Sequence, residues 1–297
     1  MKSKKALITG ATGFIGSHLA YRLFSAGWDL HIIVRPESQT SLINKIINNV
    51  TLHHHDGSTA GMIHIFKNAK PDIVFHLASL FIDKHTPEDI EPMIRSNIFF
   101  GTQLLEAIKV CSINMLINAG TSWQHFDNED YNPVCLYAAT KQAYADILRY
   151  YIETTPLRAI TLKLFDTYGP GDPRIKLFSL LQSASKSDMT LSFSPGDQLI
   201  DIVYIDDVID AFIQAAFLLS NNTFKYDEFA LSSGCTVSLK DLVNLYCIIS
   251  GKNLSYQWGK KPYRPREVMI PWNKGKSLPG WQPKYSLEKG IRQILNA

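Results

Sequence analysis

The sequence predicts an α/β protein in which a doubly wound parallel sheet is followed by a smaller C-terminal lobe. In the first half of the chain, short apolar runs alternate with amphipathic stretches, and most of the runs are too short to be helices. Near-continuous apolar strands separated by helices are typical of a parallel sheet that is covered on both faces. The pattern becomes irregular after Leu164, where residues 168–173 form a turn cluster.

The expected strands are the apolar runs rich in aliphatic and β-branched residues: Lys5–Thr9, Leu30–Val34, Val50–His53, Asp72–His76, Met115–Asn118 and Ala159–Leu164. The expected helices lie between them, at Phe14–Ala26, Ser58–Lys67, Pro87–Cys111 and Leu136–Glu153. We expect a first domain over residues 1–165 and a second lobe over 166–297, with some segments of the lobe returning to the first domain.

Composition excludes several classes of function. The 297 residues carry 30 basic and 27 acidic side chains, a net charge of +3, which is no footprint of a nucleic-acid-binding protein. The four cysteines form no CxxC pair, so we expect free thiols and a cytoplasmic protein. The most apolar window, 208–219, contains Asp210, so no membrane span is expected.

A glycine-rich turn links the first expected strand to the first expected helix. In Gly10-x-x-Gly13-x-x-Gly16, Gly10 permits a tight turn, Gly13 leaves room for a pyrophosphate, and Gly16 lets helix and strand approach closely. The helix N-terminus offers unpaired N–H groups and a positive dipole end to phosphates. The turn therefore predicts dinucleotide binding, with these further contacts inside it: Thr12, Phe14 and Ile15.

The ends of the next two strands bear on the cofactor's identity. An acidic residue after the second strand would bind the ribose 2′-hydroxyl of NAD, but this chain has Arg35 there, which suits a 2′-phosphate. We therefore favour NADP(H), with NAD(H) and a solvated arginine as the alternatives. After the third strand, Asp56, followed by Gly57, is placed to accept from an adenine amino group. The adjacent run of histidines predicts no metal site, because successive strand residues point to opposite faces.

Tyr137 and Lys141 have the i, i+4 spacing that places both on one face of a helix. A neighbouring ammonium group is expected to lower the pKa of the tyrosine, so the pair can act as a general acid–base. The fifth expected strand leads into Thr121 and Ser122, at the edge where parallel sheets bind ligands. One of these hydroxyls is expected to polarise a substrate carbonyl, with Thr121 preferred, unless the pair only caps a turn.

The chain resembles the extended short-chain dehydrogenase/reductases that act on nucleotide sugars, the NAD-dependent epimerase/dehydratase family. The motifs that carry the resemblance follow in the family's order: Gly10-x-x-Gly13-x-x-Gly16, Asp56, His76-Leu77-Ala78-Ser79, Asn97-x-x-x-Gly101-Thr102, Thr121, Tyr137-x-x-x-Lys141 and Tyr168-Gly-Pro-Gly171. The resemblance implies a Rossmann domain, a nucleotide-diphosphate-sugar substrate in the second lobe and a homodimer. It also implies that Leu77, Ala78, Ser79, Asn97, Tyr137 and Lys141 contact the cofactor.

Within this family the chain looks most like 4-ketoreductases of the CDP-paratose/CDP-abequose synthase kind. That likeness implies NADPH-dependent reduction of the C4 keto group of an NDP-4-keto-6-deoxy or 3,6-dideoxy hexose, for the deoxysugars of O-antigen and lipopolysaccharide. The related 4,6-dehydratases carry Asp-Glu after the catalytic threonine, where this chain has Ser122 and Trp123. A dehydratase is therefore not expected.

The nucleotide-sugar site departs from the family at two positions. Asp166 stands where asparagine is usual, and Ile200 stands where an arginine often contacts phosphate. Other cations must offset that loss, and the candidates are Arg264 with Arg266, or Arg174 with Lys176. The expected substrate residues are Ser122, Trp123, Asp166, Arg174, Arg264 and Arg266, although each cation can also be a solvated surface group. Two alternatives stay open, an NAD-dependent nucleotide-sugar C4 epimerase and a non-catalytic NADP(H)-binding regulator.

Overall fold

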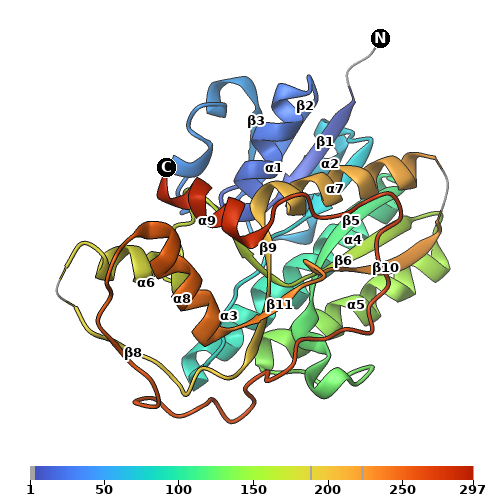
Figure 1. Cartoon of the computed structure of the whole chain (residues 1–297). Coiled ribbons are helices and arrows are strands. Elements are labelled where there is room, and N and C mark those ends of the chain that lie inside the picture. The colour runs from blue at the N-terminus through green and yellow to red at the C-terminus, as the bar shows by residue number, and fades with distance from the viewer. Residues whose placement is uncertain (1–3, 188, 222–223, 297) are drawn as a thin grey trace.

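The computed structural model describes residues 4–187, 189–221 and 224–296, and it is built on one large parallel sheet (Figure 1). The strand order is β10-β6-β5-β4-β1-β2-β3, and every pairing in this sheet is parallel. The bounds are β1 Lys5–Thr9, β2 Asp29–Val34, β3 Thr51–His54, β4 Ile73–His76, β5 Met115–Thr121, β6 Arg158–Leu164 and β10 Tyr226–Leu231. The predicted α/β class with a doubly wound parallel sheet is confirmed, and the sheet is Rossmann-like.

Helices cover both faces of the sheet because successive strand side chains point in opposite directions. Ala6 and Ile8 of β1 belong to the core under α1 (Phe14–Ser25) and α7 (Ile205–Ser220). Leu7 belongs to a second core, which α2 (Thr59–Ala69), α4 (Phe100–Val110) and α5 (Leu136–Thr154) cover. Helix α1 packs against α7, and Arg22 Nη1 lies 2.8 Å from Asp210 Oδ1 across that contact.

The second half of the chain forms a smaller lobe and also completes the main sheet. Its sheets are β11-β9-β7 and β12-β8, and Figure 1 shows α6, α8 and β8 gathered at one side of the main sheet. The bounds are β7 Asp166–Tyr168, α6 Leu177–Ala184, β8 Leu191–Ser192, β9 Leu199–Tyr204, β11 Thr236–Ser238, α8 Leu239–Ser250, β12 Tyr256–Gln257 and α9 Leu287–Leu295. The segments that return to the large sheet are α7 and β10, and the boundary near residue 165 remains a proposal.

One expected helix is interrupted. The sequence predicts a single helix over 87–111, but the structure divides it into a 3₁₀ turn (Pro87–Asp89), α3 (Ile90–Ile94), a π-helical turn (Arg95–Phe99) and α4. The π turn carries the buried Asn97 toward the end of β4. The remaining 3₁₀ turns are Ser41–Ile43, Ile47–Asn49, Ser122–Gln124 and Phe126–Asn128.

Candidate active site

The glycine turn lies where β1 ends, and its backbone explains two of its three glycines. Gly10 has a φ of +75°, and a Cβ there would lie 2.6 Å from the backbone nitrogen of Ala78. A Cβ on Gly16 would lie 2.1 Å from the carbonyl oxygen of Gly10, so helix and turn could not pack. At Gly13 the nearest atom would be 3.4 Å away. Packing therefore does not demand a glycine at position 13, and the missing side chain leaves the front of the turn open to a ligand.

The first turn of α1 fits a phosphate group. Gly13 is its N-cap and supplies no capping side chain, and no acidic residue lies in its first turn. By contrast, serine side chains cap α2, α8 and α9, through Ser58, Ser238 and Ser286. An uncapped helix N-terminus beside a glycine turn presents N–H groups and a positive dipole end to an anion. Thr12, Phe14 and Ile15 lie in this segment, so the residues present fit a dinucleotide pyrophosphate.

The ends of β2 and β3 lie beside this turn and carry the residues expected to contact the rest of the dinucleotide. The exposed Arg35 pairs with Glu37, whose Oε1 is 3.2 Å from its Nε. Asp56 accepts hydrogen bonds from the backbone and the hydroxyl of Ser58, and these lower the pKa of its carboxyl group. The carbonyl of Gly57 accepts from Gln103 of α4 at 2.8 Å, which fixes the loop in which Asp56 stands.

Asn97 supports the loop that follows β4, which contains Leu77, Ala78 and Ser79. Its Oδ1 accepts from the hydroxyl of Ser79 and from the backbone of Leu80, and its Nδ2 donates to the carbonyl of Leu80 and the hydroxyl of Thr140. The four hydrogen bonds engage the whole side-chain amide within the protein. Asn97 therefore joins the β4 loop to α5, and we propose that it supports the cofactor groove from behind rather than by direct contact.

Tyr137 and Lys141 lie one turn apart on α5, where Lys141 is buried and Tyr137 is partly buried. Burial raises the pKa of Tyr137 to about 12, and it outweighs the hydrogen bond to Ser79 and the charge of Arg174, both of which lower that pKa. Burial also lowers the pKa of Lys141, to about 8. The expectation that the ammonium group would lower the tyrosine pKa is therefore wrong for this structure, because loss of solvation dominates. Tyr137 is protonated at neutral pH, the form that a general acid needs.

Thr121 lies at the end of β5, buried, with its hydroxyl oriented by the following 3₁₀ turn. The oxygen Oγ1 accepts from the backbone N–H of Trp123 at 3.3 Å, so its own proton is available to another acceptor. The chain then folds back, because the N–H groups of Asn132 and Val134 donate to the carbonyls of Gln124 and Trp123. This return brings Tyr137 to the end of the strand that carries Thr121.

A cleft of about 610 Å³ opens between the sheet edge and the smaller lobe. Trp123 and Phe81 line it on the side of the candidate catalytic residues, and the Phe81 ring lies 4.9 Å from the Tyr137 ring. A smaller chamber of about 180 Å³ continues past Ser122 and shares part of its lining with the cleft: Trp123, Asp166, Ile200 and Arg264. The cleft therefore leads from the neighbourhood of Tyr137 into the second lobe.

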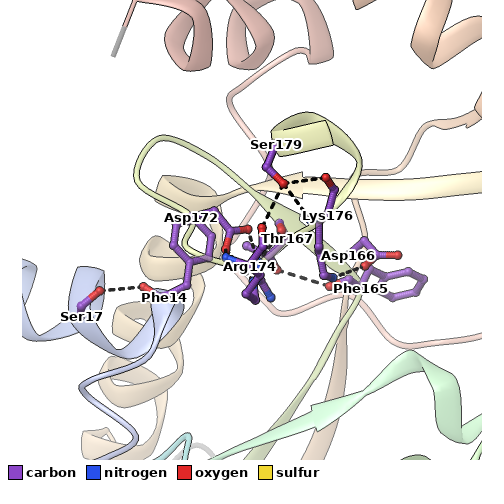
Figure 2. Close-up of polar contacts among 9 residues, drawn as sticks. All are labelled: Phe14, Ser17, Phe165, Asp166, Thr167, Asp172, Arg174, Lys176 and Ser179. Carbon is purple, nitrogen blue, oxygen red and sulfur yellow. Dashed lines mark hydrogen bonds and ion pairs between the residues drawn. The ribbon is translucent and has the colours of Figure 1, made fainter. Parts of the chain in front are cut away.

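Basic side chains line this cleft, each paired with a carboxylate. Arg174 makes two bonds to Asp172, with Nη2 at 2.6 Å from Oδ2, and its guanidinium carbon lies 4.9 Å from the centre of the Phe14 ring of α1. Figure 2 shows this segment, in which Lys176 reaches Asp166, 2.7 Å away. Burial raises the pKa of Asp166, but Lys176 and the neighbouring arginines outweigh it and hold that pKa below its usual value.

The two C-terminal arginines differ in position. Arg264 lines the cleft, pairs with Glu267 at 2.8 Å, and reaches Asp83 of the first domain at 3.5 Å. Arg266 is absent from the lining of both cavities and lies 4.2 Å from the Phe126 ring, with its Nε buried and unpaired. The structure thus brings Arg264, Arg174 and Asp166 together with Trp123 and Ser122, and it leaves Arg266 outside.

Sequence reasoning missed Phe81, Asp83 and Glu267. Phe81 is a 47% exposed aromatic side chain that contacts both Tyr137 and Trp123. The sequence gives one indication of its role: Phe81 is an apolar residue in the loop after His76-Leu-Ala-Ser, and such loops often carry binding residues. Asp83 carried no signal as a partner of Arg264, because the two residues are far apart in the sequence. Glu267 lies only three residues from Arg264, so this pairing is local.

Two features are absent from the described part of the chain. No group of three or more His, Cys, Asp or Glu side chains in it could hold a metal ion. No helix in it is long and apolar enough to cross a membrane.

Comparison with known proteins supports these observations. Residues 6–223 match the model described as "NAD dependent epimerase/dehydratase family". The CDP-abequose synthase of Salmonella muenchen is 23% identical over 297 residues, covering 99% of this chain and 98% of that protein. The CDP-abequose synthase of Yersinia pseudotuberculosis is 27% identical over 270 residues, covering 90% and 91%.

Solved structures share the fold. The UDP-glucose-4-epimerase of Stenotrophomonas maltophila, solved with bound NAD and formylated UDP-arabinopyranose, superposes with a TM-score of 0.85. It is 19% identical in sequence and the match covers 99% of this chain and 97% of that one. A structural neighbour of this fold thus holds a nicotinamide cofactor and a nucleotide sugar together.

Proposed function

The chain belongs to the NAD-dependent epimerase/dehydratase family, and on that premise we propose that it is a nucleotide-sugar 4-ketoreductase. It would reduce the C4 keto group of an NDP-4-keto-6-deoxy or 3,6-dideoxy hexose with NADPH, in the biosynthesis of deoxysugars for O-antigen or lipopolysaccharide. The CDP-abequose synthases among its relatives support deoxysugar chemistry. This proposal is more specific than the family, which also contains epimerases and dehydratases.

The observation that carries the proposal is the residue set at the end of β5. Thr121, Tyr137 and Lys141 supply a hydroxyl donor, an acid and a cation, whereas Ser122 and Trp123 supply no acid or base for removing water. With a pKa raised to about 12, Tyr137 holds the proton that a reduction must deliver. The set therefore favours reduction over dehydration.

The proposed mechanism follows from these groups. When bound, the reduced nicotinamide supplies a hydride to C4. Thr121 donates a hydrogen bond to the carbonyl oxygen and stabilises the charge that develops there. Tyr137 gives its proton to that oxygen, and the Lys141 ammonium group stabilises the phenolate left behind. The ionised tyrosine then recovers a proton from solvent.

The cleft cations would hold the diphosphate. Arg174, Lys176 and Arg264 each face a carboxylate in this structure, so a phosphate must compete with those carboxylates for the same N–H groups. Asp166 adds a negative charge to that site, which Lys176 neutralises. This arrangement supports a diphosphate ligand whose oxygens would replace the carboxylates as hydrogen-bond partners of these cations.

The nucleotide specificity and the reaction are tested in one experiment. Purified protein is mixed with NADPH and CDP-, dTDP-, UDP- or GDP-4-keto-6-deoxy sugars, and the loss of reduced nicotinamide is followed by its near-ultraviolet absorbance. We expect stoichiometric consumption of NADPH with one donor. No consumption with any donor would contradict the proposal.

The second candidate is an NAD-dependent C4 epimerase, which the epimerase among its structural neighbours favours. An epimerase uses the same tyrosine and lysine but retains its cofactor between half-reactions. Inversion at C4 of a non-keto UDP- or CDP-sugar, with NAD that co-purifies and no net consumption of NADPH, would establish it instead.

We propose NADP(H) rather than NAD(H) because of Arg35. Its guanidinium group stands at the end of β2, and a 2′-phosphate would replace Glu37 as its partner. Arg35→Ala is therefore expected to weaken NADPH binding about 10-fold or more, while NADH binding changes little. Fluorescence titration measures both. Arg95→Ala, at an equally exposed arginine paired with Glu91, is the matched control.

We also propose a homodimer. Apolar side chains stand exposed on the segment from α3 to α5, among them Ile94, Phe99 and Tyr150. Such side chains on neighbouring helices favour a helix-to-helix interface between two copies. Size-exclusion chromatography coupled to multi-angle light scattering tests this proposal. A molar mass equal to that of one chain at micromolar concentration would contradict it.

A further inference from the structure

A buried glutamine connects the strand that carries Thr121 with the helix that carries Tyr137. Gln124, which is 1% exposed, accepts from the backbone N–H of Thr121 through Oε1 at 3.2 Å. Its Nε2 donates to Oε1 of Gln142 on α5 at 2.7 Å. Nε2 of Gln142 then donates to Oδ1 of Asp146, one turn further along, at 2.9 Å. These three bonds form a single chain of amide hydrogen bonds with one direction.

The surroundings leave the Gln124 amide little freedom. A Cβ on Gly120 would lie 3.4 Å from Gln124 Oε1 and 2.9 Å from a methyl group of Thr161, so the side chain is packed under β5. The backbone carbonyl of Gln124 is held separately by the N–H of Asn132. The side chain is therefore anchored at both ends, to the catalytic threonine and to α5.

We propose that Gln124 is a positioning residue that sets the separation of the Thr121 and Tyr137 hydroxyl groups through Gln142. The inference rests on the proposed function, because it assigns those hydroxyls to one carbonyl oxygen. Gln142 directly follows Lys141, so Gln124 is hydrogen-bonded to the turn of α5 that carries the proposed catalytic pair. A displacement of about 1 Å between reacting groups can lower turnover about 100-fold.

The direction of the hydrogen bonds gives a sharp test. Gln124→Glu keeps an acceptor for the Thr121 N–H, but at pH 8 it places a carboxylate oxygen against Gln142 Oε1. Gln142 can rotate its amide so that Nε2 donates to the introduced carboxylate. Its Oε1 then faces the carboxylate of Asp146, and two acceptors repel each other. In the double variant Q124E/D146N, the side chain at position 146 can donate to that oxygen. The two bonds made by Gln142 then both form in the opposite direction, while the Thr121 N–H still donates to the introduced carboxylate.

We expect kcat of Q124E to fall 10- to 100-fold while KM for the sugar and Kd for NADPH change less than threefold. We expect Q124E/D146N to recover to within about threefold of the wild-type kcat. A Q124E protein with wild-type kcat, or a double variant that shows no recovery although it binds NADPH normally, would overturn the proposal. If Q124E does not fold, Gln142→Met removes the same link from the half-buried helix side, and unchanged kcat in that variant would also overturn it.

The outcome is separable from that of the proposed function. If the wild-type protein reduces no keto sugar, the proposed function fails, and the positioning role is then judged from crystal structures. The separation of the Thr121 and Tyr137 oxygens should change in Q124E and return in Q124E/D146N. An unchanged separation in Q124E would overturn the inference by itself.

Discussion

At the scale of single residues, burial shifts the pKa values of Tyr137 and Lys141 in opposite directions. Its pKa is raised to about 12 by burial, whereas its neighbour Lys141 has a pKa lowered to about 8 by the same cause. Burial thus moves both groups toward their uncharged forms. The protein holds the tyrosine as a donor and keeps a lysine that can lose its charge in the slightly alkaline range.

Tyr137→Phe removes the proton donor and should lower turnover by roughly 10²- to 10⁴-fold. Cofactor binding should stay within a few-fold, because the ring and its packing against Phe81 remain. Stopped-flow absorbance gives the rate, and fluorescence titration gives the NADPH affinity. Tyr131→Phe, at an exposed position that lines neither cavity, should match the wild type. Wild-type turnover by Tyr137→Phe would remove the tyrosine from the mechanism.

Lys141→Met should stabilise the folded protein at neutral pH by roughly 2 to 4 kcal/mol, while it lowers activity. The folded-state pKa, about 8, lies below the ordinary value of 10.5, so the unfolded chain holds more protons between the two. The free energy of unfolding of the wild-type protein therefore rises as the pH increases from about 8 to 10.5, because the penalty for burying the charged Lys141 disappears.

Urea unfolding of both proteins between pH 7 and pH 9.5 measures this effect. The advantage of the Met variant over wild type should be largest at pH 7 and narrow toward pH 9.5. Lys252→Met, at an exposed lysine, should show neither the gain nor the pH dependence. A Met variant that is less stable than wild type at every pH would mean that the ammonium group is well solvated where it stands.

At the scale of elements, the glycine turn separates two kinds of glycine. A Cβ at Gly16 would collide with the Gly10 carbonyl at 2.1 Å, so Gly16→Ala should lower both stability and cofactor affinity. A Cβ at Gly13 meets nothing closer than 3.4 Å, so Gly13→Ala should melt near the wild-type temperature and still bind NADPH about 10-fold more weakly, or worse. Thermal melts and fluorescence titration check both. Unchanged affinity in Gly13→Ala would place the phosphates elsewhere.

The elements that the sequence predicted are those with local signals. The strands β1 to β6 were placed within three residues at each end, because each is an apolar run between turn residues. Strand β10 had no such signal: Asp227 and Glu228 interrupt its apolar pattern, and its pairing with β6 joins segments more than 60 residues apart. The candidate catalytic residues followed from the spacing of Tyr137 and Lys141, from their place after the fifth strand and from the family resemblance. The pKa of Tyr137 and the pairing of Arg264 with Asp83 depend on tertiary packing instead.

At the scale of the whole molecule, the first domain is completed by the second half of the chain. Strand β10 forms the edge of the main sheet beside β6, and α7 covers α1. A fragment of residues 1–165 would expose the edge of β6 and the apolar face under α7. It should therefore aggregate or show no cooperative urea transition by circular dichroism, whereas the full chain should show one. A cooperative transition in the fragment would mean that the first domain folds alone.

The contact between α1 and α7 also sets an order in time. During synthesis the glycine turn and α1 leave the ribosome early, but α7, which packs on α1, begins only at Ile205. At about 5 to 20 residues per second, α7 follows α1 by roughly 10 to 40 s. For that interval the apolar flank of α1 is open to solvent and to chaperones. The nascent chain should acquire its ability to bind cofactor late, after most of the polypeptide has been made.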